Sequence, residues 1–143
     1  MKGIPPIIGI SDYGVCTELN LQVYLKDEGQ PYAGYGANPT GSFKDRGMSV
    51  VASMACYYGL SSLSVPIQGN AGDSLSESGV ANNLAVAVIM PYDTPMPIMG
   101  KVAAYSLQHV GISLDLVKDT IREAGAWIKQ KYLPEGYFNC ATF

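Results

Sequence analysis

The sequence predicts an α/β fold, in which an open parallel sheet carries helices on both faces. Short apolar runs typical of strands alternate with longer segments of helical period along most of the chain. One of these runs, residues 84–90, is apolar throughout, which is typical of a strand covered on both sides. The connections are short and contain glycine and proline, so we expect β-α units joined by right-handed crossovers.

Strands are expected over residues 22–26, 61–67, 84–90 and 112–117, with a further strand starting at Gly136. Residues 1–21 contain prolines and glycines that interrupt any period. We therefore expect this first segment to be a poorly organised lead-in to one α/β domain that occupies residues 1–143.

The first two helices have clear boundaries in the sequence. One is expected from Phe43 to about Tyr58, where Gly59 provides a stop. The other opens from the glycine-containing turn at residues 68–72 and runs to about Asn82.

The last two helices are expected at residues 100–109 and 120–132. Prolines at positions 91, 95 and 97 favour an extended loop before the helix at residues 100–109. His109 is then the last residue of that helix. The second has an apolar stripe at helical spacing, with Trp127 beside the stripe and expected in the core.

Composition excludes several classes of function. The chain has 143 residues, a formal net charge of −3 and no basic patch, which argues against a nucleic-acid partner. No apolar run is long enough to cross a membrane, and the N-terminus does not have the pattern of a signal peptide, so we expect a cytoplasmic protein. Charged residues make up only 15% of the sequence, which suggests that part of the surface packs against other protein.

The metal-binding residue types are too few and too scattered for a metal site. Cys16, Cys56 and Cys140 have neither paired spacing nor an even number, so they are interpreted as reduced thiols. His109 is the only histidine in the sequence, which excludes a histidine-rich metal site.

The most informative stretch is residues 38–47, Asn-Pro-Thr-Gly-Ser-Phe-Lys-Asp-Arg-Gly. Ser42 is a good N-cap residue, and Asp45 three positions later completes a pattern like a capping box. Lys44 is then in the first helical turn, where the positive end of the helix dipole disfavours an ammonium. A neutral amine is the form that attacks a carbonyl group. Position alone also fits an ordinary solvated lysine.

Other motifs can be excluded at this stretch. Gly36 and Gly41 have the spacing of a phosphate-binding loop, but Ser42-Phe43 stands where that loop needs lysine and a hydroxyl residue. A dinucleotide fingerprint starting at Gly34 would require glycine at position 39, which is proline. Ser42 and Lys44 are two residues apart, a spacing that does not place side chains together on a helix.

A second candidate lies in the turn at residues 68–72, Gln-Gly-Asn-Ala-Gly. A strand followed by a glycine turn and a helix directs backbone N–H groups toward an anion. The same pattern occurs in ordinary loops between strands and helices, so the residues alone leave both interpretations open.

The ten-residue string around Lys44 resembles the lysine motif of the threonine synthases, and more broadly the tryptophan-synthase-β-like, fold-type II pyridoxal-phosphate (PLP) enzymes. The resemblance implies that Lys44 is the catalytic lysine and holds PLP as a Schiff base. It implies that Asn70 contacts the cofactor 3′-oxygen and that the amides of Gly69 and Ala71 bind the substrate carboxylate. Ser42 is assigned to the substrate as well.

The resemblance implies the conversion of O-phosphohomoserine into threonine and phosphate. Threonine dehydratase and cysteine synthase share the scaffold and stay as alternatives. The sequence differs from the family pattern by an insert at residues 31–37 and by Ile67-Gln68 in place of hydroxyl residues. Asp73 also adds an anion near the expected anion site.

The resemblance covers residues 22–143 and corresponds to the N-terminal portion of a family member. The family's later glycine-rich loop, which holds the cofactor phosphate, has no counterpart in these residues, so we expect a truncated chain. Its expected partners are a small-molecule amino-acid substrate and another copy or a missing C-terminal half, with no nucleic acid or membrane. The non-enzymatic alternative is an inactive fragment that acts as a binding module.

Overall fold

The computed structural model describes residues 7–9, 24–26 and 38–141. The chain divides into two compact units, residues 1–43 and residues 44–143. In the first unit, strand β1 (Ile7–Gly9) pairs antiparallel with strand β2 (Tyr24–Lys26). Strand β2 lies within the segment expected to be a strand, whereas β1 was not expected from the sequence.

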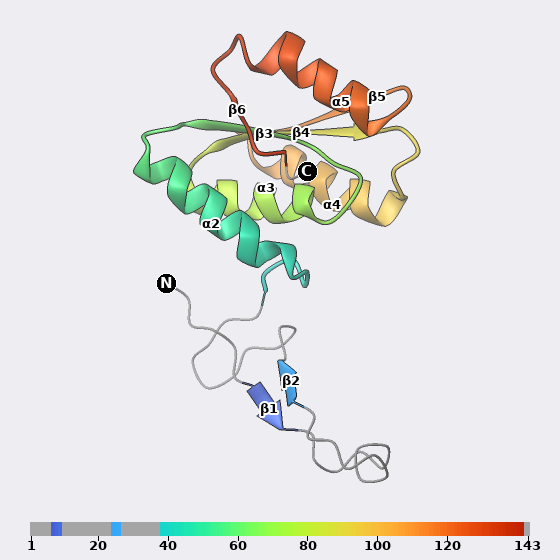
Figure 1. The fold of residues 1–143 in the computed structure, drawn as a ribbon. Coiled ribbons are helices and arrows are strands. Elements are labelled where there is room, and N and C mark those ends of the chain that lie inside the picture. The colour runs from blue at the N-terminus through green and yellow to red at the C-terminus, as the bar shows by residue number, and fades with distance from the viewer. Residues whose placement is uncertain (1–6, 10–23, 27–37, 142–143) are drawn as a thin grey trace. The chain divides into compact units, whose positions relative to one another are not determined.

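The second unit is built on a parallel sheet of four strands in the order β5-β4-β3-β6 (Figure 1). Its strands are β3 (Ser62–Pro66), β4 (Ala85–Pro91), β5 (Ile112–Val117) and β6 (Phe138–Asn139). Each neighbouring pair is parallel. The predicted fold class is therefore confirmed.

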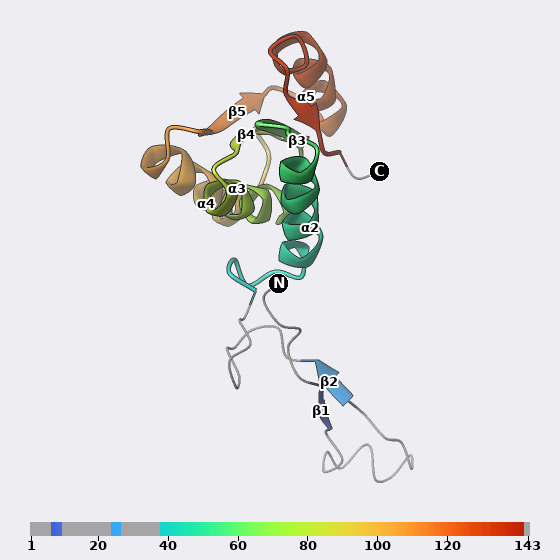
Figure 2. The ribbon, with the colours of Figure 1, turned by 90° about the vertical axis from the view of Figure 1, so that its left-hand side faces the viewer.

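Helices cover both faces of this sheet, as predicted. Helices α2 (Lys44–Tyr57), α3 (Ala71–Asn82) and α4 (Met96–Gln108) lie on one face, and α5 (Ile121–Trp127) lies on the other (Figures 1 and 2). Strand β4 contributes to both cores. Its residues Val86, Val88 and Met90 join the core on the three-helix side, while Ala87 and Ile89 join the core beneath α5. This two-sided burial explains why residues 84–90 are apolar throughout.

Helix α3 packs tightly against the sheet at two glycines that face the strands. A Cβ atom at Gly72 would come within 2.9 Å of Val88 Cγ1, and one at Gly79 would come within 2.3 Å of Val86 Cγ2. These distances are too short for any side chain larger than hydrogen. The close approach leaves α3 buried along most of its length, between α2, α4 and the sheet.

Helix α2 ends as the sequence predicts. Gly59 adopts a left-handed conformation with φ of +71°, the Gly59 amide donates to Cys56 O, and the Leu60 amide donates to Ala55 O. This pair of hydrogen bonds is the Schellman motif, which uses glycine because it needs positive φ. At its other end α2 begins at Lys44, one residue later than expected.

Helix α4 corrects a prediction. It begins at Met96, not at Gly100, and Pro97 lies inside its first turn. The first backbone N–H groups of a helix have no partner within the helix, so a proline there costs little. The prolines before Gly100 were interpreted as extending the loop, whereas one of them is accommodated in the helix.

The segment expected as one helix over residues 120–132 is also different. Helix α5 ends at Trp127 and continues as a π-helical turn, η1 (Ile128–Tyr132), in which the Leu133 amide donates to Ile128 O. Such a turn closes over five residues and carries more residues than an α turn. The apolar stripe is partly confirmed, because Ala124, Ile128 and Tyr132 are buried.

The end of α5 and the π turn together bring three donors to one carboxylate. Asp115 Oδ2 accepts from Trp127 Nε1 at 2.6 Å, Lys131 Nζ at 2.8 Å and the Tyr132 hydroxyl at 2.9 Å. Trp127 was expected in the core, but it is 40% exposed and serves as a hydrogen-bond donor to the edge strand β5. These contacts fix the end of α5 on β5.

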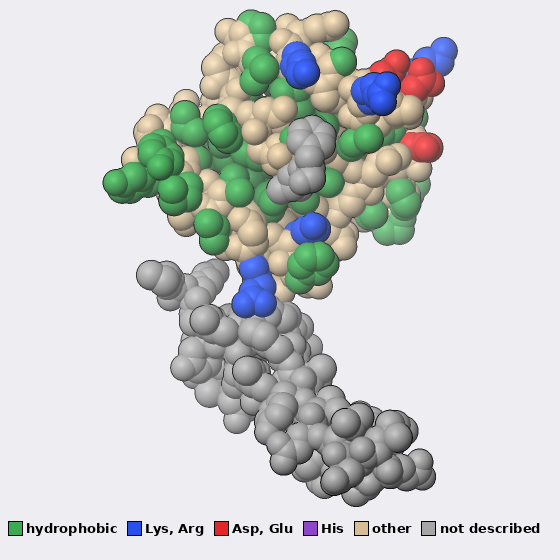
Figure 3. All heavy atoms as spheres, in the orientation of Figure 1, with side chains coloured by type: hydrophobic (Ala, Val, Ile, Leu, Met, Phe, Trp, Pro, Cys, Tyr) green, Lys and Arg blue, Asp and Glu red, His purple; other side chains and the backbone are tan. Residues whose placement is uncertain are grey.

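The surface carries apolar side chains along α2. Val50, Met54, Tyr57 and Tyr58 are exposed. A groove of about 440 Å³ beside them is lined by Val50, Val51, Met54, Ala55, Tyr58, Leu60, Leu63 and Phe138. Figure 3 shows apolar side chains gathered over the carboxyl end of this helix. In the part of the chain that the structure describes, no helix combines the length and apolarity needed to cross a bilayer.

Candidate functional site

The candidate site lies where strands β3 and β4 end and helices α3 and α4 begin. The carboxyl ends of parallel strands and the following helix amino ends lie at the same edge of the sheet (Figure 1). Ligands of open α/β sheets bind at this edge. Asn70, one of the predicted site residues, immediately precedes α3 and so lies at this edge.

Lys44 is the first residue of α2 and is half-buried. Helix α2 packs against α3. Burial raises the pKa of Asp73 in the first turn of α3, and the charge of Asp45, the buried residue after Lys44, adds to that rise. The first turns of α2 and α3 are therefore neighbours, and Lys44 and Asn70 belong to adjacent helix starts.

The turn before α3 presents polar groups that the helix does not use. Asn70 is exposed, and its side chain makes no capping hydrogen bond. Ala71 is buried at the first helical position, and the Gly72 amide donates to Gly69 O at 3.4 Å. An amide side chain beside a helix amino end is a donor set that suits an anionic oxygen.

Gln68 is tied to the next loop along the same edge. Its Nε2 atom donates to Asp93 Oδ1 at 2.7 Å. The sequence showed that Gln68 replaces a hydroxyl residue, but it did not show this partner, which lies 25 residues away. The hydrogen bond links the turn that carries Gly69 and Asn70 to the loop between β4 and α4.

Asp73, the acid near the expected anion site, is buried and paired with a cation. Its side chain is 1% exposed, its Oδ1 atom accepts from the Ser74 amide at 3.0 Å, and its Oδ2 atom lies 3.2 Å from Lys101 Nζ on α4. The expected repulsion is therefore offset by a cation. Lys101 was interpreted as a solvated helix residue, and it is half exposed, but it is also the ion-pair partner of Asp73.

Ser42 is buried in the segment that precedes α2, which belongs to the first unit of the chain. Its assignment to substrate binding stays a prediction. No group of three or more metal-binding side chains occurs within residues 7–9, 24–26 and 38–141. Cys56 is exposed and Cys140 is buried, and both are free thiols, while Cys16 lies outside the described residues.

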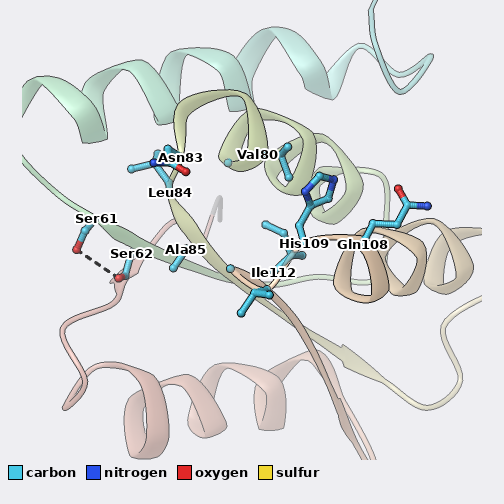
Figure 4. Close-up of a pocket in the computed structure, with 12 residues that line it drawn as sticks. Ser61, Ser62, Val80, Asn83, Leu84, Ala85, Gln108, His109 and Ile112 are labelled. Atoms are coloured by element: carbon cyan, nitrogen blue, oxygen red, sulfur yellow. Dashed lines mark hydrogen bonds between the residues drawn. The ribbon is translucent and has the colours of Figure 1, made fainter.

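A separate cavity lies at the opposite edge of the sheet (Figure 4). It has a volume of about 590 Å³ and lies where strands β3, β4 and β5 begin and α3 and α4 end. Ser61, Ser62, Asn83, Gln108 and His109 contribute polar groups to its lining. His109, expected at the end of the helix at residues 100–109, is the C-cap residue that follows α4. None of the predicted site residues lines this cavity.

The described residues fit an aldehyde cofactor with anionic oxygens. A lysine at a helix start can supply an amine, and the neighbouring turn supplies an amide side chain that is not used in capping. The acidic residue in the first turn of α3 is paired with Lys101, so it does not occupy the turn with an uncompensated charge.

The sequence is similar to curated threonine synthases. It is 35% identical to the threonine synthase of Methanosarcina acetivorans over 82 residues, which is 57% of this chain and 18% of that protein. It is 32% identical to the threonine synthase of Methanocaldococcus jannaschii over 112 residues, 76% of this chain and 24% of that protein. The chain thus spans about a fifth to a quarter of these relatives. No protein-family model matches the sequence.

The structure is similar to several solved enzymes. Serine racemase from Dictyostelium discoideum superimposes with a TM-score of 0.76 at 21% identity, over 97% of this chain and 41% of that one. The processed form of threonine deaminase isoform 2 from Solanum lycopersicum gives 0.72 at 20% identity, over 96% and 34%. A PLP-dependent aspartate racemase gives 0.67 at 19% identity, over 97% and 40%.

The fold is therefore that of the fold-type II PLP enzymes. Within this class, the homologues found by sequence are threonine synthases, which confirms the resemblance recognised around Lys44.

Proposed function

We propose that this chain carries the lysine-bearing part of a PLP-dependent threonine synthase, which converts O-phosphohomoserine and water into threonine and phosphate. The observation that supports it is the pairing of two helix starts: Lys44 begins α2, and Asn70 precedes the neighbouring α3. The similarity to threonine synthases favours this reaction over those of the structural neighbours, which include racemases and a deaminase.

Each residue of the proposed site has a role in binding or in proton transfer. Lys44 Nζ would hold the cofactor, and its amine would carry protons to and from the substrate carbons. The Asn70 side chain would orient the cofactor ring by contacting the 3′-oxygen of the cofactor. The amides of Gly69 and Ala71, with Ser42, bind the substrate. When bound, PLP supplies the electron sink that stabilises a carbanion.

The proposed surroundings follow the same inference. We propose a cytoplasmic protein whose other part, or a second copy, covers the exposed apolar side chains on α2. The free thiols of Cys56 and Cys140 agree with a reducing compartment. Residues 1–143 are proposed as one PLP-enzyme-like α/β portion of that protein.

Cofactor capture tests the role of Lys44. Purified chain is mixed with PLP, reduced with borohydride and digested, and the modified lysine is identified by mass spectrometry. We expect saturable labelling at Lys44, loss of that label in Lys44→Ala, and unchanged labelling in Lys129→Ala, which removes an exposed lysine on η1. Labelling spread over several lysines and unaffected by Lys44→Ala would contradict the proposal.

A second experiment separates the reaction from cofactor binding. Loaded chain is incubated with O-phosphohomoserine, and phosphate and threonine are measured, with L-threonine and O-acetylserine as alternative substrates. Equal release of phosphate and threonine supports the threonine-synthase reaction. Deamination of threonine or replacement of acetate would assign one of the related reactions. Specific labelling without any turnover would support the alternative of a non-enzymatic binding module.

A further inference from the structure

The first turn of α3 contains a nearly inaccessible carboxylate next to the proposed anion-binding turn. Asp73 is three residues after Asn70, and its side chain is 1% exposed. An uncompensated negative charge in this turn would cancel part of the positive potential that the helix start offers to a bound anion. It would also repel an anionic group bound to the amides before it.

The charges that face Asp73 come from three helices. Lys101 of α4 lies 3.2 Å from Asp73 Oδ2. Asp45 of α2 adds a second buried carboxylate nearby. One turn further along α3, Glu77 accepts a hydrogen bond from the Tyr105 hydroxyl of α4 at 2.8 Å. Lys101 is therefore the cation that the described residues place against Asp73.

We propose that Lys101 is a positioning residue of the candidate site, whose ammonium neutralises Asp73 and so keeps the first turn of α3 able to bind an anion. This inference rests on the proposed function, because it concerns the turn that would contact the cofactor and substrate. In this proposal Lys101 acts through Asp73 and does not contact the cofactor or the substrate. Lys101 is half exposed, whereas Asp73 is buried.

A purely structural role predicts a different pattern. If the ion pair only ties α3 to α4, removing either partner has the same effect on the site. If the pair acts by charge, the two removals act in opposite directions, because Lys101→Met leaves a bare anion and Asp73→Asn leaves a cation. The Tyr105–Glu77 hydrogen bond ties the same two helices, so Tyr105→Phe is a matched control.

The test measures the PLP concentration that half-saturates borohydride-fixed label at Lys44 in the full chain. We expect Lys101→Met to raise this concentration by about tenfold and Asp73→Asn to leave it unchanged or lower it. Lys101→Arg keeps the charge and should remain within about twofold of wild type. Tyr105→Phe should do the same, and Asp73→Asn/Lys101→Met should recover most of the loss.

The pH dependence gives an independent readout. Burial raises the pKa of Asp73, and removing Lys101 removes a cation that holds it down. The difference between wild type and Lys101→Met should therefore shrink as the pH falls and Asp73 becomes neutral. If the ion pair only holds α3 against α4, the difference between wild type and Lys101→Met should not change with pH. Thermal melts identify any variant that does not fold. If Lys101→Met does not fold, Asp73→Asn and the double variant still show whether the charge of Asp73 weakens PLP binding.

The outcomes separate the two proposals. A wild-type chain that is not labelled at Lys44 overturns the proposed function and this inference with it. A labelled wild type, with Lys101→Met and Asp73→Asn weakened equally, overturns the inference alone. Weakening confined to Lys101→Met, with recovery in the double variant, supports both.

Discussion

The backbone of Gly79 in α3 lies against the side chain of Val86 in β4. A Cβ atom at position 79 would be 2.3 Å from Val86 Cγ2 and 3.4 Å from the carbonyl oxygen of Leu84. Val86 is fully buried in the central part of the sheet, so it has little room to move. The distance between α3 and the sheet, and with it the position of the turn before α3, depends on this glycine.

Gly79→Ala should destabilise the protein. Alanine is a better helix former than glycine, which by itself would stabilise α3 by about 1 kcal/mol. Overpacking against Val86 costs about 1–3 kcal/mol, so the free energy of unfolding should fall in a urea titration followed by circular dichroism. The control is Gly125→Ala in α5, where a Cβ atom would meet nothing within 4 Å. An equal gain in stability from both substitutions would contradict the close packing of α3.

The hydrogen bonds to Asp115 predict a pH-dependent stability. Burial alone would raise the pKa of Asp115, but donation from Lys131, Trp127 and Tyr132 outweighs it and lowers the pKa below its ordinary value. A carboxyl group with a lowered folded-state pKa stabilises the fold above its unfolded pKa of about 4 and loses that contribution as the pH falls further. Asp115→Asn should therefore lower the melting temperature at pH 7 more than at pH 3.

The matched control for this prediction is Asp119→Asn. Asp119 is exposed, and its hydrogen bond to Glu123 Oε2 is donated by its backbone amide. Its melting temperature should change little at either pH. A pH-independent difference between Asp115→Asn and the wild type would mean that the carboxylate charge contributes nothing to holding α5 on β5.

The two described cysteines should react at different rates. Burial raises the pKa of Cys140 to about 11, whereas Cys56 is exposed. Because the thiolate is the reactive form, Cys140 should react with iodoacetamide at pH 8 roughly a hundredfold more slowly than Cys56. The measurement is peptide mapping in a Cys16→Ser background. Adding denaturant should make the rates equal, and equal rates without denaturant would place Cys140 at the surface.

The Gln68–Asp93 hydrogen bond should restrain the turn before α3. It is exposed, so Asp93→Ala should change the free energy of unfolding by less than about 1 kcal/mol. Amide hydrogen exchange at residues 69–71 should nevertheless become roughly three- to tenfold faster. In the wild type the turn must break this hydrogen bond to open, and in the variant it need not. Glu135→Ala, at an exposed acid elsewhere, should leave exchange unchanged. Unchanged exchange in Asp93→Ala would show that the loops open independently.

The sequence predicted the elements whose signals are local. Strand β5 has the expected bounds, and α3 ends at Asn82 as expected, because apolar period and turn residues act over a few positions. The start of α4 was missed since proline is compatible with both a loop and a first helical turn. The π turn was missed because its distinguishing contact, to Asp115, lies on another element.

The candidate site could be predicted in part for the same reason. Lys44 and Asn70 lie in short motifs that resemble a known family, and the fold brings their helix starts together. The partners of Gln68 and Asp73 could not be predicted, because Asp93 and Lys101 come from distant parts of the chain. Only the packing of α3 beside α4 shows that the charge of Asp73 is compensated.

The π turn also gives the protein its own optical reporter. Trp127 is the only tryptophan in the sequence, and its indole N–H is bonded to Asp115 while Lys131 lies 5.7 Å from the centre of its ring. A charge so close to an indole changes the wavelength and yield of its emission. Intrinsic fluorescence will therefore report whether α5 is docked on β5 without any added label, and this signal comes from the face of the sheet opposite the helices that carry Lys44 and Asn70.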